Sequence, residues 1–226
     1  VQQLIEAKGF YIMPPIAFAD QTPNVELGLP YPAAPNSQNW LGTDDQGRDV
    51  LARILYGMRV SLLFGLALTL TGAIIGIIVG AIQGYYGGWV DLAGQRFMEV
   101  WGGMPQLFMI IILVSLFSPS IYVLFALMLL FGWMGLVGLV RAEFLRARNF
   151  DYVRAARNLG VSDSQIMWRH ILPNALASSL SQLPFILTAN IIALTALDFL
   201  GYGLPPGSPS LGELMVQGKN NLDAPW

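Results

Sequence analysis

Apolar residues gather in three long runs that contain no Asp, Glu, Lys or Arg. The runs cover residues 60–90, 100–140 and 170–197. Apart from tyrosines in the first two runs, the only ionisable side chain in them is that of His170, at the start of the third. A helix needs about 20 mainly apolar residues to cross the hydrocarbon core of a bilayer. The first and third runs therefore each predict one membrane crossing.

The middle run is too long for one crossing. As a single helix it would be about 60 Å long, roughly twice the hydrocarbon thickness. The stretch "SPSIY" interrupts it, because Pro119 ends a helix and the flanking Ser118 and Ser120 favour a turn. The pattern predicts an all-α, polytopic transmembrane bundle with four crossings. These cover Val60–Gln83, Val100–Phe117, Ile121–Val140 and Ala175–Leu197.

Glycines recur at every fourth residue of the first crossing. This repeated GxxxG pattern places small residues along one stripe, where another helix can approach closely. Glycine is common in membrane helices, but four in phase favour close packing. The stripe consists of Gly72, Gly76, Gly80 and Gly84, and a similar series in the third crossing consists of Gly132, Gly135 and Gly138. We expect a tightly packed bundle that can continue into a second subunit.

The basic residues predict the orientation of the bundle. Arg141–His170, here called the arginine-rich segment, holds six of the 12 Lys and Arg residues. Lys and Arg near membrane spans are retained on the cytoplasmic side, so this segment is predicted to be cytoplasmic. With four crossings both ends of the chain then lie outside. The flanks agree, since their basic residues are only Lys8, Arg48 and Lys219.

The predicted organisation has three parts. Residues 1–46 form an extracytoplasmic loop, 47–200 form the transmembrane domain with a cytoplasmic loop at 141–174, and 201–226 form a second extracytoplasmic loop.

Two arginines, Arg53 and Arg59, precede the first crossing and need a separate explanation. The apolar residues around them share one helical face, which is typical of an interfacial elbow helix. Such a helix lets arginine side chains snorkel to lipid headgroups. The face consists of Val50, Leu51, Ile54, Leu55 and Met58.

The arginine-rich segment predicts two short helices. The stretch "NFDYVRAARNLG" can begin at Asn149 or Asp151 as N-cap and end at Gly160. The stretch "SDSQ" at 162–165 is a capping box that opens the second helix, which Pro173 closes or kinks.

The first of these helices has two different faces. Tyr152, Ala155, Ala156 and Leu159 share one face, and Arg154, Arg157 and Asn158 share the other. The segment could be a connector whose arginines set topology or bind anionic lipid headgroups. It could also dock into a groove on a partner protein. Ala155 and Ala156 favour docking, because a lipid-binding helix would carry Leu, Phe or Trp instead.

The stretch "RAARNLGVSDSQIMWRHILPN" resembles the EAA loop of ABC-importer permeases, in which Glu-Ala-Ala is followed by a glycine and an Ile-x-Leu-Pro ending. The residues that match this pattern are Ala155, Ala156, Gly160 and Leu172–Pro173. Arg154 and His170 replace the Glu and Ile of the general pattern, as in the form used by dipeptide and oligopeptide permeases.

Two further stretches are similar to the C-type subunit of peptide permeases: "NWLGTDDQGRDVLARILYGMRVSLLFG" and "LDFLGYGLPPGSPSLGELMVQGKNNL". The resemblance covers Asn39–Trp226. Within this family, "LDFLG" with Asp198 and "GWMGLVGLVRAEFLRARNFDY" resemble the Yej-type permeases associated with peptide and microcin C uptake. Members have six crossings with cytoplasmic ends, so the first and sixth are expected to be absent from this chain.

The resemblance implies a permease subunit of an ATP-driven ABC importer for peptides or peptide-like compounds, multi-pass in the bacterial inner membrane, which works by alternating access. The implied partners are a second permease, an extracytoplasmic peptide-binding protein, and two cytoplasmic ATPase subunits or one with two ATPase domains. ATP and Mg²⁺ would lie on the ATPase, and no catalytic, cofactor or metal site is expected here. The implied ATPase-coupling residues are Asp151, Tyr152, Arg154, Ala155, Ala156, Arg157, Leu159 and Gly160.

Other classes fit less well. A net charge of −2 argues against nucleic acid, and the absence of cysteine excludes disulfides and cysteine metal sites. His170 has no evident serine nucleophile beside it, and "GELMVQGKN" departs from the P-loop both in its spacing and at Asn220. Asp198, at the edge of the last crossing, could mark a transport pathway, as buried acids in membranes often do, or it could end the helix or pair with a loop. The remaining alternative is a non-ABC membrane channel or a lipid-binding scaffold with a basic cytoplasmic loop.

Overall fold

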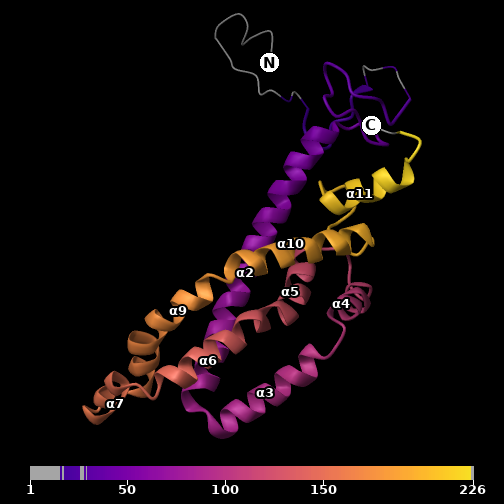
Figure 1. The fold of residues 1–226 in the computed structure, drawn as a ribbon. Helices are drawn as coiled ribbons and strands as arrows, with labels where there is room; N and C mark the ends of the chain where they lie inside the picture. Colours follow the sequence, from indigo (N-terminus) through magenta and orange to yellow (C-terminus); the bar gives the residue numbers. More distant parts are fainter. Residues whose placement is uncertain (1–15, 17, 26–27, 29, 225–226) are drawn as a thin grey trace, which may run out of the picture. The chain divides into compact units, whose positions relative to one another are not determined.

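The computed structural model describes residues 16, 18–25, 28 and 30–224. Regular structure in these residues is helical, apart from two isolated β-bridges, Pro23 with Arg48 and Thr43 with Asp49. This confirms the all-α expectation (Figure 1).

The chain divides into two compact units. One unit combines the described residues of 1–60 with those of 207–226, and the other consists of residues 61–206. The first unit thus brings together two segments that the sequence predicted as separate loops. We call them the terminal unit and the central unit.

Four segments are candidates for crossing a membrane. Helix α2, Val50–Tyr86, and the helical stretch Ile121–Ala147 are each long and apolar enough to do so. Two further pairs of helices pass the same test together but are bent, by 71° and by 55°. With each bent pair counted as one span, the number agrees with the four predicted crossings.

These spans are built from shorter elements. Ile121–Ala147 consists of α5 (Ile121–Gly132), a 3-10 turn η2 (Trp133–Leu136) and α6 (Val137–Ala147). The first bent pair is α3 (Gly88–Gly102) with α4 (Gln106–Val114), and the second joins Asp163–Leu180 to α10 (Leu183–Phe199). The remaining helices are α7 (Asp151–Asn158), α8 (Asp163–Gln165), a π-helix η3 (Ile166–Ile171), α9 (Leu172–Leu180) and α11 (Leu211–Asn220).

The second crossing differs from its predicted bounds. Its helix begins at Gly88 rather than Val100, because the charged stretch before Val100 is also helical and belongs to α3. The chain bends before Pro105, which is the N-cap of α4 and has no N–H to continue the helical hydrogen bonds. The predicted break near Pro119 is present, since Ser120 caps α5 by accepting a hydrogen bond from the N–H of Tyr122.

The glycine stripe of α2 lies against the third crossing of the same chain. A Cβ atom added at Gly76 would lie 2.5 Å from the carbonyl oxygen of Trp133, and one at Gly80 would lie 2.7 Å from that of Val137. Gly84 approaches the carbonyl oxygen of Arg141 as closely, at 2.5 Å, whereas Gly72 makes an ordinary contact of 3.4 Å with that of Gly132. The stripe is therefore used in packing within the central unit.

The glycines of the third crossing do not form the expected thin contact face. A Cβ at Gly132 or Gly138 would meet no atom within 4 Å, and one at Gly135 would make ordinary contact with Ile186. The close approach to α2 instead uses the backbone of η2 and α6, so these three side-chain positions make no close packing contact with the described part of this chain.

An apolar core in the central unit joins α2, α4, α5 and α10. Its buried members are Phe64, Leu68, Ile110, Leu124, Met128, Phe131, Leu194 and Leu197. Beside it, the carboxylate of Asp198 accepts a hydrogen bond of 2.5 Å from the N–H of Leu204. Asp198 therefore pairs with the loop after α10, as the sequence suggested.

The terminal unit is held by buried ion pairs. Arg53, whose side chain is 0% exposed, lies 2.8 Å from Glu213 and 3.5 Å from Asp44. Arg48 contacts the same two carboxylates at 3.3 Å and 2.7 Å. Buried charges are stable only when paired in this way.

The interfacial elbow predicted before the first crossing was wrong. Helix α2 is continuous from Val50, and Arg53 is paired inside the protein instead of snorkelling to headgroups. Arg59 is exposed. The sequence also missed helix α11, whose N-cap Ser210 accepts hydrogen bonds from the N–H groups of Gly212 and Glu213.

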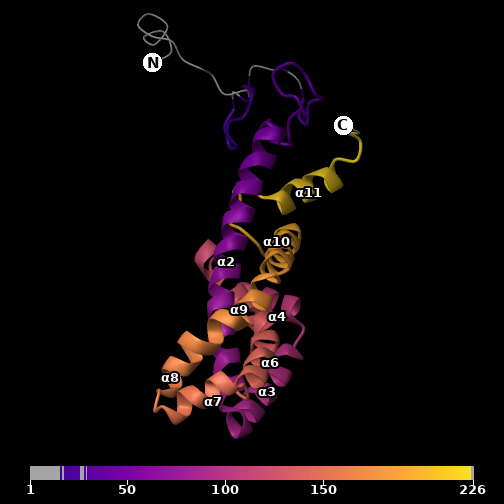
Figure 2. The same cartoon turned by 60° about the vertical axis from the view of Figure 1, so that its left-hand side comes forward.

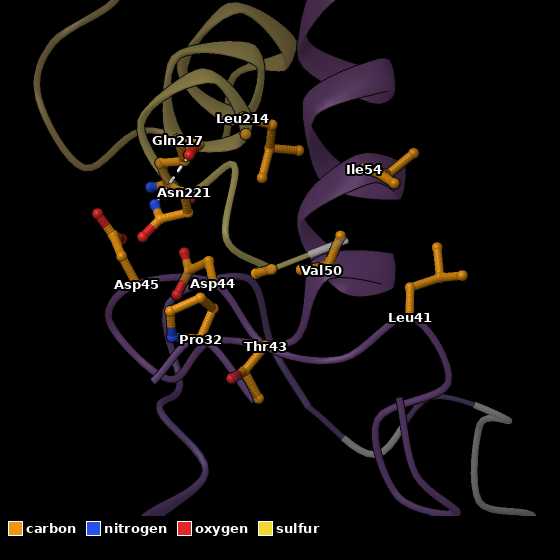
Figure 3. Close-up of a pocket in the computed structure, with 12 residues that line it drawn as sticks. Pro32, Leu41, Thr43, Asp44, Asp45, Val50, Ile54, Leu214, Gln217 and Asn221 are labelled. Atoms are coloured by element: carbon orange, nitrogen blue, oxygen red, sulfur yellow. Dashed lines mark hydrogen bonds between the residues drawn. The ribbon is translucent and has the colours of Figure 1, made fainter. Parts of the chain in front are cut away.

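A cavity of about 210 Å³ opens in the terminal unit between α2, α11 and the loop before α2 (Figure 3). Val50, Ile54 and Leu214 form an apolar side, and Asp45 and Asn221 lie on another.

Candidate coupling site

Helix α7 forms the centre of the site, and its two ends have different caps. Its N-cap is Phe150, which makes no side-chain capping bond, so the predicted caps Asn149 and Asp151 were wrong. Asp151 lies in the first turn, where a carboxylate interacts favourably with the helix dipole.

The C-terminal end of α7 agrees with the sequence. Gly160 has φ +77°, and its N–H binds the carbonyl of Arg157. The N–H of Val161 binds the carbonyl of Ala156. Together these bonds form a Schellman motif, which requires a left-handed residue at the position of Gly160.

The second helix of the segment begins as predicted but continues differently. The hydroxyl of Ser162 accepts a bond of 3.4 Å from the N–H of Gln165. After this turn the chain forms the π-helix η3, which contains His170, and then continues as α9 with Pro173 in its first turn. The irregular turn thus lies directly before the proline, which cannot donate a helical hydrogen bond.

Helix α7 buries a narrow face. Val153 is 0% exposed and Ala156 is 8% exposed, whereas the other residues of 151–160 are exposed. Leu159 is 83% exposed. The predicted common face therefore divides, because Ala156 packs inward with Val153, while Tyr152, Ala155 and Leu159 remain outside.

The buried face joins a core built from several helix ends. In it, α7 meets the end of α2, helices α6 and α9, and the π-helix η3, and α6 and α9 lie side by side (Figures 1 and 2). Besides Val153 and Ala156, its buried members include Ala81, Tyr85, Val140, Phe144, Ala147, Ile166, Met167, Ile171 and Ala175. A displacement of α7 would therefore act directly on these helices, since packed cores transmit strain.

Tyr85, at the end of α2, is a polar centre of this core. Its hydroxyl donates a 2.5 Å hydrogen bond to Asp163 and accepts one of 3.1 Å from Arg157. The guanidinium of Arg157 also lies 5.6 Å from the centre of the Tyr85 ring. The hydrogen bond to Tyr85 is the main cause that raises the pKa of Arg157.

The side chain of Arg148 binds the backbone at the same end of α2. Its guanidinium donates a 3.3 Å hydrogen bond to the carbonyl of Tyr85. Gly87 has φ +64°, and a Cβ there would lie 2.3 Å from a guanidinium nitrogen of Arg148. Glycine therefore lets the turn after α2 pass close to this arginine.

Arg141 pairs with Asp91 and ties α6 to α3. Two hydrogen bonds join the groups, one of them 2.7 Å long. Arg146 makes an exposed pair with Glu143, and Arg154 on α7 is exposed. Charge counting treated all six arginines alike, whereas three of them, Arg141, Arg148 and Arg157, hold the segment against α2 and α3.

Comparison with known proteins identifies the family. Residues 59–226 match the family described as binding-protein-dependent transport system inner membrane component. The chain belongs to this family. The matched range contains the whole arginine-rich segment, so the site described above lies inside a family domain of inner-membrane transport components.

The similar proteins are permeases of this family. Over its whole length the chain is 60% identical to the inner membrane ABC transporter permease protein YejE of Escherichia coli (strain K12). It is 52% identical to the peptidoglycan transport system permease protein YejE of Agrobacterium fabrum, again over the whole chain. Over 81% of the chain it is 34% identical to the dipeptide transport system permease protein DppC of Bacillus subtilis, covering 58% of that protein.

These comparisons confirm the resemblance to peptide permeases and give no support to the non-ABC channel or scaffold. The chain spans 66% of the length of each YejE relative, just under two thirds.

Proposed function

We propose that this chain is a permease subunit of an ATP-driven ABC importer for peptides or peptide-like compounds. Family membership and the similarity to dipeptide and peptidoglycan permeases support this proposal. The structural observation that carries it is helix α7, which presents an exposed face while Val153 and Ala156 anchor it in a core shared with α2, α6 and α9.

In this proposal the arginine-rich segment is cytoplasmic and α7 is the coupling helix. ATPase subunits, or one subunit with two ATPase domains, bind ATP and Mg²⁺ and receive α7 in a cleft. Tyr152, Ala155 and Leu159 supply the docking face, and Arg154 lies exposed beside them. Closure of the ATPases moves α7, and the core passes the motion to the membrane helices, so that the permeases alternate their access.

The proposal places the terminal unit outside the membrane, where a peptide-binding protein delivers the cargo. A second permease completes the pathway. Peptides and peptidoglycan-derived compounds are the expected cargo class, and the Yej-type resemblance adds microcin C as a peptide-like candidate.

The docking proposal is tested by Ala155→Trp in the full-length protein, co-expressed with its ATPase, second permease and binding protein. We expect this variant to insert normally but to lose co-purification of the ATPase and ATP-dependent uptake of labelled peptides. Ala142→Trp is the matched control, since Ala142 is an exposed alanine of the arginine-rich segment outside α7. Normal ATPase binding by Ala155→Trp, or equal loss in both variants, would contradict docking through this face.

A further inference from the structure

The hydroxyl of Tyr85 is bound from both sides of the turn at Gly160. Arg157 lies on α7 before this turn, and Asp163 begins α8 after it. One hydroxyl therefore connects the end of a 37-residue helix to two successive helices of the arginine-rich segment.

These two hydrogen bonds need a group that donates one and accepts the other. Asp163 is an acceptor and Arg157 a donor, and a hydroxyl can serve both at once. Hydrogen bonds to charged groups are stronger than neutral ones. No ion pair joins Arg157 directly to Asp163 in the described part of the chain, so Tyr85 bridges them.

The surroundings give this bridge a fixed position. Tyr85 is only 4% exposed and its ring packs in the core that contains Val153 and Ala156. Arg148 binds the carbonyl of the same residue, one of the last carbonyls of α2, which have no partner within the helix. The arginine-rich segment thus holds Tyr85 by its side chain and by its backbone.

Helix α2 connects the restrained Tyr85 to the third crossing. Its glycine stripe packs closely on the backbone of η2 and α6, with Gly80 against Val137 and Gly84 against Arg141. Movement of Tyr85 along or around the helix axis would therefore act on the third crossing as well as on the first.

We propose that Tyr85 is a positioning residue that couples the arginine-rich segment to α2 through its hydroxyl. This inference rests on the proposed function. Without the hydroxyl, α7 and α8 lose their polar link to the end of α2 and only the apolar core and Arg148 connect them, so ATP hydrolysis continues but drives less transport.

The test uses the assembled full-length transporter in proteoliposomes and measures peptide uptake and ATP hydrolysis in the same sample. Coupling between sites typically corresponds to about 5- to 150-fold in equilibrium constants. For Tyr85→Phe we expect uptake per ATP hydrolysed to fall by about fivefold or more. Assembly and the maximal rate of ATP hydrolysis should remain near wild type.

Tyr86→Phe is the matched control. Tyr86 is the next residue, is 53% exposed, and its hydroxyl makes no hydrogen bond to the described residues. We expect its uptake per ATP to equal that of the wild type.

A second pair of variants tests the same link from the other side. Asp163→Asn keeps an acceptor for the Tyr85 hydroxyl and should retain most of the coupling, whereas Asp163→Ala should lower uptake per ATP as Tyr85→Phe does. If Tyr85→Phe fails to assemble, the comparison of Asp163→Asn with Asp163→Ala tests the inference in its place.

Wild-type uptake per ATP in Tyr85→Phe or in Asp163→Ala would overturn the inference. A parallel fall of uptake and hydrolysis, with an unchanged ratio, would also overturn it and assign Tyr85 a structural role. Absence of ATP-dependent uptake by the wild-type assembly would instead overturn the proposed function.

Discussion

Arg53 on the first turns of α2 lies 2.8 Å from Glu213 on α11, although 160 positions separate them in the chain. This contact joins the two segments of the terminal unit. Both residues also belong to the charge cluster with Arg48 and Asp44.

We expect Glu213→Ala to destabilise the terminal unit by roughly 1–3 kcal/mol, because it leaves a buried guanidinium with one carboxylate fewer. Hydrogen exchange of residues 211–220 in detergent would show the loss as faster exchange. Glu99→Ala is the control, since Glu99 forms an exposed pair with Arg96 and such pairs contribute little. Equal exchange in wild type and Glu213→Ala would contradict the role of this cluster.

Gly76→Ala should weaken the packing of α2 on the third crossing. The added Cβ would lie 2.5 Å from the carbonyl of Trp133, and overpacking of this kind costs about 1–3 kcal/mol. Thermal unfolding of the purified protein measures the effect. Gly138→Ala should have little effect, because its Cβ meets open space. A similar melting temperature for both variants would show that the stripe tolerates side chains.

Gly160 should tolerate asparagine much better than proline or valine. Its φ of +77° suits glycine, and asparagine adopts this region more readily than branched residues do. We expect Gly160→Pro and Gly160→Val to abolish ATP-driven uptake while membrane insertion, measured by fractionation, stays normal. Gly160→Asn should retain substantial uptake. Full uptake by Gly160→Pro would exclude a functional role for the Schellman turn.

Ala155 and Ala156, which the sequence placed on one face, should now give different phenotypes. Ala156→Trp should lower thermal stability, because Ala156 is buried in the core with Val153. Ala155→Trp should leave the melting temperature unchanged while ATPase binding and the uptake that depends on it are lost. Equal destabilisation by both variants would contradict the inward packing of Ala156.

The pH dependence of the terminal unit should contain a contribution from Asp45. Partial desolvation of the largely exposed Asp45, followed by the charge of Asp44, raises the pKa of Asp45 above 3.8. A raised carboxyl pKa means that the folded form binds the proton more tightly, so this group costs stability as pH rises from 3.8 through the raised pKa. Asp45→Asn should therefore gain stability relative to wild type over that window and keep the gain at neutral pH.

Melting curves of Asp45→Asn and wild type at a series of pH values check the sign of this pH dependence. Asp223→Asn is the control, because Asp223 is exposed like Asp45 but does not line the cavity that Asp45 lines. A difference between Asp45→Asn and wild type that shrinks as pH rises would contradict it.

Features with local causes could be predicted from the sequence. The charge-free runs indicate the number of crossings, Gly160 ends α7, and Ser162 opens the next helix, because each depends on residues a few positions away. The glycine stripe on α2 was also visible, although its partner helix was not.

Features that depend on distant partners could not be predicted. Arg53 looks like a membrane-edge residue until Glu213 is known to lie beside it. Tyr85 looks like the aromatic end of a crossing, since its partners Arg157 and Asp163 lie more than 70 positions away. Val153 was missed because the alanine pair suggested a different helical face.

The π-helix at Ile166–Ile171 sets a length requirement for the site. A π-helical turn is a local widening by one residue, and each residue of an α-helix turns the chain by about 100°. Deleting one residue here would regularise the helix but swing α7 and the hydroxyl partners of Tyr85 around the axis of α9. The number of residues between Gly160 and Pro173 thus determines the rotational orientation of α7 relative to the helices that it is proposed to move.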